Sequence, residues 1–362
     1  MAPLVLKLQD HPEIESIVCV TAQHRQMLDQ VLDIFKITPD YDLNIMQKNQ
    51  TLCGITTRAV NGLDDVIASA KPDMILVHGD TSTTFAGALA AFYHKVPVGH
   101  VEAGLRTYDK YSPFPEEMNR RLTGVLADLH FAPTRKNRDN LLAEGITSHV
   151  YVTGNTVIDA IANTVREDYV FHTMPLHRLD FQKNRVILLT AHRRENYGTP
   201  MEHILQAVNE ITRRFEDVQV VYPVHLSPYV QEVAGRYLAE NQRVHRVPPL
   251  AVDEMHNLMA RSYLIMTDSG GLQEEAPSLG KPVLVLRKET ERPEAVEAGT
   301  VKLAGVSRDG IVSLASELLE NRAAYEKMAK AANPYGDGHT SERIVQLILR
   351  YFDESRELPA LF

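Results

Sequence analysis

The chain has 362 residues, of which 44% are hydrophobic and 23% are charged, and its formal net charge is −9. These values are ordinary for a globular protein, and the length predicts about two domains at ~150 residues each. The negative charge argues against a nucleic acid or an anionic membrane as partner, although a local cluster of Arg and His can still bind a small anion.

Short apolar runs rich in Val and Ile recur along the chain, and each is followed by a stretch of helical character. Residues 2–9 come first and look like the apolar face of a helix. We then predict strands at 16–22, 73–80, 96–103, 128–134 and 149–155, and a second set at 185–192, 218–225, 263–271 and 282–287, with weaker candidates at 244–248 and 301–304. The runs are continuous rather than alternating, which indicates parallel sheets covered by helices on both faces. A helix and an irregular segment within 155–183 mark the predicted domain joint.

The remaining bulk features point to a cytoplasmic protein. Cys19 and Cys53 lie outside any CxxC motif or Cys/His cluster, so we interpret both as reduced thiols that fill space. No apolar run approaches the ~20 residues of a membrane span. The N-terminus, MAPLVLKLQDHPEIE, lacks the charge order and the cleavage site of a signal peptide.

Polar and charged residues follow nearly every predicted strand, where ligands bind to open parallel sheets. The segments are QHRQ (23–26), HGDT (78–81), EAGLR (102–106), HRREN (192–196), His225, DSGG (268–271) and Arg287. Each has a structural interpretation when taken alone, such as a helix N-cap at Asp80 and Thr81. Their repetition on one edge of both sheets predicts a ligand site.

The stretch MTDSGGLQEEA joins a buried strand to a helix through a glycine pair. Gly270 and Gly271 allow a phosphate to approach backbone N–H groups at a helix N-terminus, and Ser269 adds a hydroxyl. Glu274 or Glu275, one turn later, could accept hydrogen bonds from ribose. The alternative is a tight turn followed by favourable first-turn charges.

The sequence resembles the non-hydrolysing UDP-N-acetylglucosamine 2-epimerases. The motifs are QHRQML, HGDTSTT, GHVEAGLRT, PFPEEMNR, TAHRREN, YPVHLSP, TDSGGLQEEAPSLGKPVLVLR, TERPE and NPYGDG, in the family's order. The resemblance implies an α/β fold of two Rossmann-like domains, similar to GT-B glycosyltransferases, with the active site in the interdomain cleft. It assigns residues 1–158 and a C-terminal helix near 344–362 to the N-terminal domain, and 159–343 to the UDP-binding domain. Family members begin with a strand and a GTRPE-type turn that are not seen ahead of Met1, which leads us to expect impaired stability and catalysis if the chain begins there.

The resemblance further implies interconversion of UDP-GlcNAc and UDP-ManNAc by elimination and re-addition of UDP through 2-acetamidoglucal, without metal or cofactor. The catalytic residues that it assigns are Asp80, Glu102, Glu116 and His192. The residues assigned to UDP and its diphosphate are Arg120, His225, Ser269, Gly270, Gly271, Glu275 and Arg292.

Bacterial members of the family can also bind a second UDP-GlcNAc as an activator, and a homodimer is the family expectation. The matching residues are Gln23, Gln26, Arg58, Glu117, His192 and Arg193. Three alternatives remain open at this point: a GT-B glycosyltransferase, a hydrolysing epimerase that releases free ManNAc, and an inactive nucleotide-sugar binder.

Overall fold

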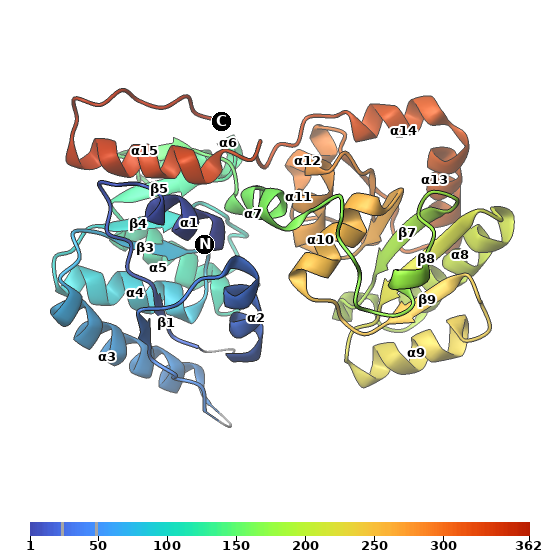
Figure 1. The fold of residues 1–362 in the computed structure, drawn as a ribbon, viewed down its shortest axis with the longest axis horizontal. Helices are drawn as coiled ribbons and strands as arrows, with labels where there is room; N and C mark the ends of the chain where they lie inside the picture. Colours follow the sequence, from blue (N-terminus) through green and yellow to red (C-terminus); the bar gives the residue numbers. More distant parts are fainter. Residues whose placement is uncertain (23–24, 48–49) are drawn as a thin grey trace. The chain divides into compact units, whose positions relative to one another are not determined.

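The computed structural model describes residues 1–22, 25–47 and 50–362. The chain divides into two compact units, the first made of Met1–Asn163 and Tyr335–Phe362 and the second of Thr164–Pro334. Both are α/β structures, and the strand pairs within the described residues are parallel (Figure 1). The α/β class with two Rossmann-like domains is therefore confirmed. Within the described residues, no helix combines the length and the apolar character that crossing a membrane requires.

The first unit contains a four-stranded sheet in the order β3-β4-β5-β6 and a separate parallel pair, β1-β2. The strands are β1 (Cys19–Val20), β2 (Tyr41–Asp42), β3 (Ile75–His78), β4 (Val98–Val101), β5 (Leu129–Ala132) and β6 (Val150–Val152). All of the predicted strands in this half occur, each shorter than expected. The two-residue strand β2 was not predicted, because the dipeptide Tyr-Asp carries no apolar run.

Eight helices of the first unit lie within the described residues: α1 (Ala2–Gln9), α2 (Arg25–Phe35), α3 (Leu52–Ala70), α4 (Ser82–Tyr93), α5 (Glu116–Leu126), α6 (Arg135–Ala143), α7 (Thr156–Thr164, which ends one residue into the second unit) and α15 (Thr340–Phe352). The helix predicted at residues 2–9 is confirmed as α1. Its Leu4 and Leu8 pack with Ile344 and Ile348 of α15 in one buried cluster. Figure 1 shows these two helices side by side although they come from opposite ends of the chain.

The second unit has one sheet of six parallel strands in the order β12-β11-β10-β7-β8-β9. The strands are β7 (Arg185–Thr190), β8 (Val218–Pro223), β9 (Val244–Val247), β10 (Leu264–Thr267), β11 (Val283–Val285) and β12 (Val301–Leu303). Counted from the first strand of this unit, the order is 6-5-4-1-2-3, which is the doubly wound Rossmann order. The chain therefore reverses its winding direction between β7 and β10, and this switch point is where ligands bind in such sheets.

Helices cover both faces of this sheet. They are η1 (Leu176–Arg178), η2 (Arg194–Asn196), α8 (Thr199–Arg214), α9 (Pro228–Leu238), α10 (Val252–Arg261), α11 (Gly270–Ser278), α12 (Pro293–Glu297), α13 (Arg308–Glu320) and α14 (Arg322–Ala329). Helices α8, α9 and α13 share one buried apolar cluster with the sheet, and Figure 1 shows α10, α11 and α12 on its other side. The continuous Val/Ile/Leu runs of these strands reflect this burial on both faces.

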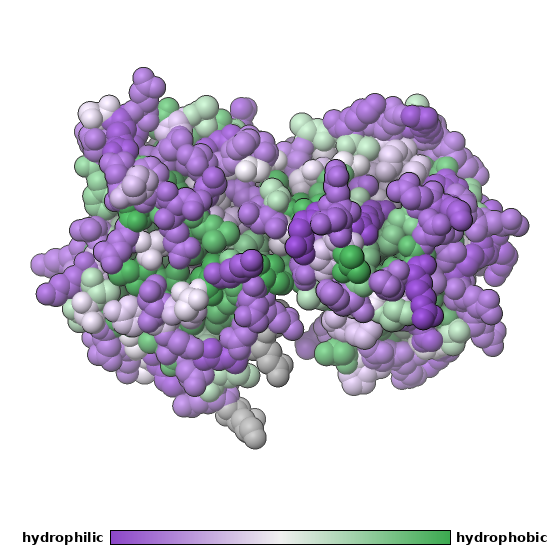
Figure 2. All heavy atoms as spheres, viewed as in Figure 1, coloured by the Kyte–Doolittle hydropathy of each residue, from purple (hydrophilic) through white to green (hydrophobic). Residues whose placement is uncertain are grey.

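The surfaces of the two units differ. On the face seen in Figure 2, apolar residues reach the surface mainly over the first unit. Most of the exposed large apolar side chains in the described part of the chain belong to that unit, including Phe92, Tyr93 and Val125. Both cysteines are free thiols, and Cys19 is half-buried, but Cys53 is exposed on the first turn of α3. The prediction that both cysteines fill space is therefore wrong for Cys53, because its position faces away from the core.

Candidate active site

The carboxyl ends of β3 and β4 bring two of the predicted catalytic carboxylates to one sheet edge. The strands are paired so that His78 lies opposite Val101. Glu102 follows Val101 directly, and Asp80 follows His78 after one glycine. Gly79 between His78 and Asp80 has φ +70°, and a Cβ there would lie 3.4 Å from Glu102 Oε2. The turn that carries Asp80 therefore runs close to the Glu102 side chain, and its backbone conformation favours glycine.

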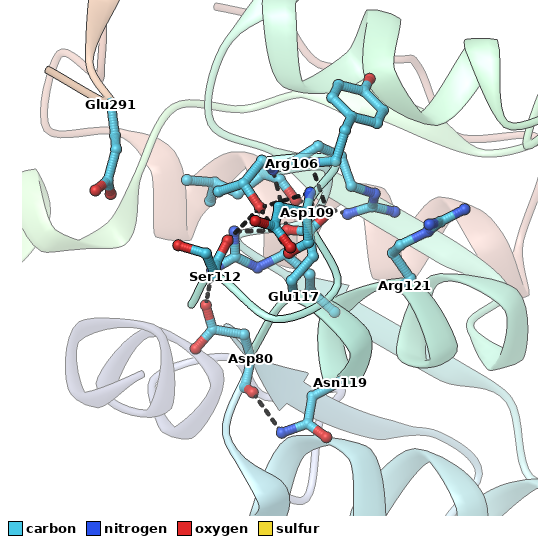
Figure 3. A network of polar contacts seen from close by, with 12 residues as sticks. Asp80, Arg106, Asp109, Ser112, Glu117, Asn119, Arg121 and Glu291 are labelled. Carbon is cyan, nitrogen blue, oxygen red and sulfur yellow. Dashed lines mark hydrogen bonds and ion pairs between the residues drawn. The ribbon is translucent and has the colours of Figure 1, made fainter. Parts of the chain in front are cut away.

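Asp80 is held from two directions by helix α5. Arg120 Nη2 donates to Asp80 Oδ2 at 2.5 Å, and Asn119 Nδ2 donates to the Asp80 carbonyl oxygen at 2.9 Å. Arg120 also pairs with Glu117, with 3.4 Å between Nη1 and Oε2. Figure 3 shows Asn119 of α5 beside Asp80, with the bond between them drawn, and Glu117 of the same helix close by. Arg120 is 8% exposed as a residue, and its guanidinium thus offsets the charge of two carboxylates in a buried place.

Glu117 is completely buried, and its carboxylate caps a loop. It accepts hydrogen bonds from the backbone N–H groups of Thr107 and Tyr108, at 3.0 and 3.1 Å. The same loop is anchored at Arg106, which is bound to Glu144 through Nε and Nη2. In this conformation Glu117 has no surface to offer to a ligand, and its contacts organise the backbone beside the site.

Glu102 adopts a left-handed backbone conformation, φ +62°, which is uncommon for a residue other than Gly, Asn or Asp. Its Oε2 lies 3.3 Å from His78 Nε2. Burial holds the pKa of His78 well below its usual value, so this imidazole is neutral near pH 7. A neutral ring beside the carboxylate can orient it through a hydrogen bond without adding a positive charge.

Two buried histidines lie in the strands β4 and β5 that end near this edge. His100 of β4 and His130 of β5 are register partners, and burial lowers their pKa values to about 3 and about 4. His100 Nε2 lies 2.8 Å from the Gly79 carbonyl oxygen, so the neutral ring donates to the turn that carries Asp80. Glu116, the third predicted carboxylate, is half-buried at the first position of α5, where the helix N-terminus favours negative charge.

The second unit places His192 and Asp268 just after the ends of two neighbouring strands, β7 and β10, at the switch point. Thr190 of β7 is the register partner of Thr267 of β10, and the two side chains follow these residues. His192 Nδ1 lies 3.3 Å from Asp268 Oδ1, and the His192 ring is stacked on His225, with 5.3 Å between centroids and 11° between planes. Burial lowers the pKa of His192, Asp268 raises it, and His225 and Arg193 lower it.

The N-terminus of α11 is open and faces positive charge. Ser269 is the N-cap, but its side chain makes no capping hydrogen bond. A Cβ on Gly270 would lie 3.8 Å from Arg292 Nη2 and 4.0 Å from Arg193 Nη2. Two guanidinium groups therefore converge on the glycine whose N–H begins the helix, which is a favourable arrangement for a phosphate.

The two adjacent glutamates of α11 have different partners. Glu274, 4% exposed, forms an ion pair with Arg292. Glu275 Oε2 lies 3.4 Å from Nε2 of the buried His256, and its Oε1 would lie 3.3 Å from a Cβ on Gly271. Glu275 is thus the glutamate on the side of the glycine pair, while Glu274 is committed to Arg292.

The residues predicted for a second ligand are distributed over both units. Arg58 donates to the Ile45 carbonyl and to Gln50 Oε1, and Glu117 is buried as described. His192 and Arg193 belong to the second unit. Gln23 lies outside the described residues, as does the side chain of Gln26. Among the residues that the structure describes, no group of three His, Cys, Asp or Glu side chains could hold a metal ion.

Comparison with known proteins decides the family. The model of the family described as UDP-N-acetylglucosamine 2-epimerase matches residues 6–349. The chain belongs to this family. The UDP-N-acetylglucosamine 2-epimerase of Bacillus subtilis is 58% identical over 363 residues, covering 100% of this chain and 94% of the relative.

Solved structures of the 2-epimerase family agree with this fold. An S. aureus protein solved with UDP is 52% identical with a TM-score of 0.89, covering 100% of this chain and 95% of that one. The UDP-GlcNAc 2-epimerase of Neisseria meningitidis bound to UDP-GlcNAc is 50% identical with a TM-score of 0.85, covering 97% and 96%. The resemblance drawn from the motifs and the GT-B-like fold class are confirmed.

Several residues that shape this candidate site received no role from the sequence. They are His78, His100, His256 and Asp268, each of which contacts a predicted site residue or its turn. His78 and Asp268 stand at strand ends, which was a usable signal. His100 and His256 lie within regular elements, and nothing in the local sequence separates them from ordinary core histidines.

Proposed function

We propose that the protein interconverts UDP-GlcNAc and UDP-ManNAc by inverting C2, without hydrolysis, and so supplies ManNAc for cell-envelope polysaccharide. The observation that carries the proposal is the joint presence of Asp80 and Glu102 at one sheet edge and of the Arg-flanked N-terminus of α11 in the other unit. Membership of the 2-epimerase family supports it. A glycosyltransferase needs one base and an acceptor site, and two adjacent carboxylates favour epimerisation.

The proposed reaction avoids a free carbanion at C2. A base removes the C2 proton while the C1–O bond breaks and its electron pair leaves with UDP, giving 2-acetamidoglucal. Protonation of C2 from the other face and return of the UDP oxygen to C1 complete the inversion. This sequence needs acid/base groups on both faces of the ring and cations on the departing diphosphate.

In this scheme the first unit handles protons and the second holds UDP. Asp80, Glu102 and Glu116 transfer or relay the C2 proton. Arg120 is paired with Asp80 and Glu117, so its predicted diphosphate contact would require that pair to open; its first role in the scheme is to hold Asp80 in place. His192 assists the leaving diphosphate.

The UDP contacts that we propose lie at the carboxyl edge of the second sheet. Ser269, Gly270 and Gly271 meet phosphate at the α11 N-terminus, with Arg292 and His225 beside them, and Glu275 accepts from ribose. The buried His256 against Glu275 supports the last assignment, because a held carboxylate loses less freedom on binding.

We further propose that a second UDP-GlcNAc activates the protein through Gln23, Gln26, Arg58, His192 and Arg193. Glu117, the sixth residue of this predicted set, is buried, so we give it the indirect role of holding the backbone of Thr107 and Tyr108. If UDP-ManNAc alone reacts at full rate, activation of this kind is excluded. We also propose a cytoplasmic homodimer. Two free thiols are consistent with the compartment. The exposed Phe92 and Tyr93 on α4 and Val125 on the neighbouring α5 offer an apolar contact surface. Sedimentation velocity tests the oligomeric state.

The decisive experiment is C2 exchange in D₂O. Incubation with UDP-GlcNAc alone should incorporate deuterium at C2 of both UDP-GlcNAc and UDP-ManNAc, with UDP and 2-acetamidoglucal detectable by NMR. Free ManNAc as the product would indicate a hydrolysing epimerase. UDP binding without any exchange would indicate an inactive nucleotide-sugar binder.

A further inference from the structure

We infer that Asp268 is a positioning residue for His192, which it fixes with the proton on Nδ1 so that Nε2 faces the ligand side. The inference deepens the proposed function, since it rests on the diphosphate role given to His192. Asp268 itself touches no substrate in this scheme.

Asp268 is a buried carboxylate whose two oxygens differ in their hydrogen bonds. The residue is 0% exposed. Its Oδ2 accepts the backbone N–H groups of His192 and Arg193, both at 2.8 Å, and the Nδ2–H of Asn196 at 3.1 Å. These bonds clamp the β7–η2 turn against the end of β10.

Oδ1 has a different environment. Within the described part of the chain it accepts no hydrogen bond, although His192 Nδ1 lies 3.3 Å away. A buried carboxylate oxygen without a partner is costly, and a small rotation of the imidazole supplies an N–H donor. The carboxylate therefore favours the Nδ1–H form of His192, in the way that a carboxylate orients a histidine in other sites.

The charges around His192 oppose one another. Asp268 favours the protonated ring, while the stacked His225 and the neighbouring Arg193 disfavour it, as does burial. His192 is 35% exposed at its side chain, whereas Asp268 is inaccessible. Nδ1 thus faces the buried carboxylate, which leaves Nε2 as the nitrogen available to a ligand. Protonation of Nε2 would convert it from an acceptor to a donor for a departing phosphate oxygen.

The test reads the tautomer of His192 directly. The full chain is labelled with ¹⁵N-histidine, and long-range ¹H–¹⁵N spectra are recorded from pH 5 to pH 9. The chain has 15 histidines, so His192 is assigned by the signals lost in His192→Gln. We expect neutral His192 as the Nδ1–H tautomer, whereas a free imidazole favours Nε2–H. An Nε2–H tautomer in the unmodified protein overturns the inference, and this measurement requires no Asp268 variant to fold.

Two variants separate positioning from stability. In Asp268→Asn we expect a mixed or Nε2–H tautomer and a lower His192 pKa, because the charge that raises it is gone. Asn196→Ala removes one of the bonds to Oδ2 and leaves the charge, so it should lower stability while the tautomer stays Nδ1–H. A tautomer and a pKa unchanged in Asp268→Asn overturn the inference.

Kinetic measurements then test whether the positioning of His192 by Asp268 contributes to the reaction. Asp268→Asn should lower kcat by about 10²-fold, within the range for loss of acid–base assistance, with a smaller change in KM. An unchanged kcat overturns the role in turnover. The tautomer is measured without turnover, so it does not depend on the proposed epimerase activity. An inactive protein with an Nδ1–H tautomer would contradict the proposed function alone, whereas an Nε2–H tautomer would contradict this inference.

Discussion

The sheet of the first unit ends in carboxylates and neutral histidines, whereas the sheet of the second ends in arginines, a glycine pair and a half-exposed His192 beside the buried Asp268. The strands of both are parallel and covered by helices, so the difference lies in the loops. In the first unit, buried His100 and Glu117 tie the site loops to the core. In the second, the helix N-terminus provides the polar groups. Similar sheets thus support proton transfer in one unit and anion binding in the other.

The largest expected contrast is acid sensitivity. His100 and His130 of the first unit have pKa values of about 3 and about 4, below the unfolded value of about 6.5. As pH falls below about 6.5, His100 and His130 become protonated in the unfolded chain but stay neutral in the folded unit. Stability should therefore fall by about 2 kcal/mol per pH unit down to about pH 4.

Chemical denaturation from pH 7 to pH 4 measures this slope. His100→Asn and His130→Asn should each flatten it, whereas the exposed His172→Gln of the second unit serves as the control. Equal slopes in all four proteins would show that other groups govern acid unfolding.

The second contrast concerns catalysis. Asp80→Asn should lower the rate of C2 exchange by about 10³-fold, since the base is lost, while UDP affinity, which we assign to the second unit, should change by less than about twofold. Deuterium exchange and calorimetry measure the two quantities. Asp65→Asn, exposed on α3, is the matched control and should leave both unchanged. Loss of UDP affinity in Asp80→Asn would contradict the assignment of UDP binding to the second unit and of proton transfer to the first.

The third contrast concerns the Asp80–Arg120–Glu117 network. Arg120→Met leaves two carboxylates without their cation, and the completely buried Glu117 cannot be rehydrated, so we expect a loss of about 3 kcal/mol in the free energy of unfolding. Arg138→Met breaks an exposed ion pair with Asp139 and should cost less than about 1 kcal/mol. Urea titrations compare them, and similar losses would contradict the importance of the network.

The smallest effect, and the sharpest for the second unit, comes from Gly270→Ala. A Cβ here has no neighbour closer than 3.8 Å, so the free protein should gain about 0.5 kcal/mol from the better helix residue. UDP affinity should fall about tenfold, or ~1.4 kcal/mol, because the methyl group occupies the space between the two guanidinium groups.

Gly235→Ala inside α9 is the control for this change. Its Cβ would also lie no closer than 3.8 Å to a neighbour, so it should give the gain in stability without the loss in affinity. Unchanged UDP binding in Gly270→Ala would place the phosphate elsewhere.

Much of the fold followed from local pattern. The Val/Ile runs predicted β7, β8 and β10 because buried parallel strands require continuous apolar sequence. The strand β2 was not predicted, because its two residues are extended through their pairing with Cys19 and Val20 and not through an apolar run of their own. For the site, the strand-end rule found Asp80 and Ser269, but it had no means of showing that Glu117 would be buried under the backbone of Thr107 and Tyr108.

The sequence by itself determined the alternation of strands and helices, the polar residues that end the strands and the family, because each depends on residues close together in the chain or on a motif. Tertiary structure alone decided which of these side chains meet. Asp268 reaches His192 across 76 residues, and Arg120 reaches Asp80 across 40. Strand order and register create such contacts, and burial then sets their charge, so neither could be inferred from the local sequence.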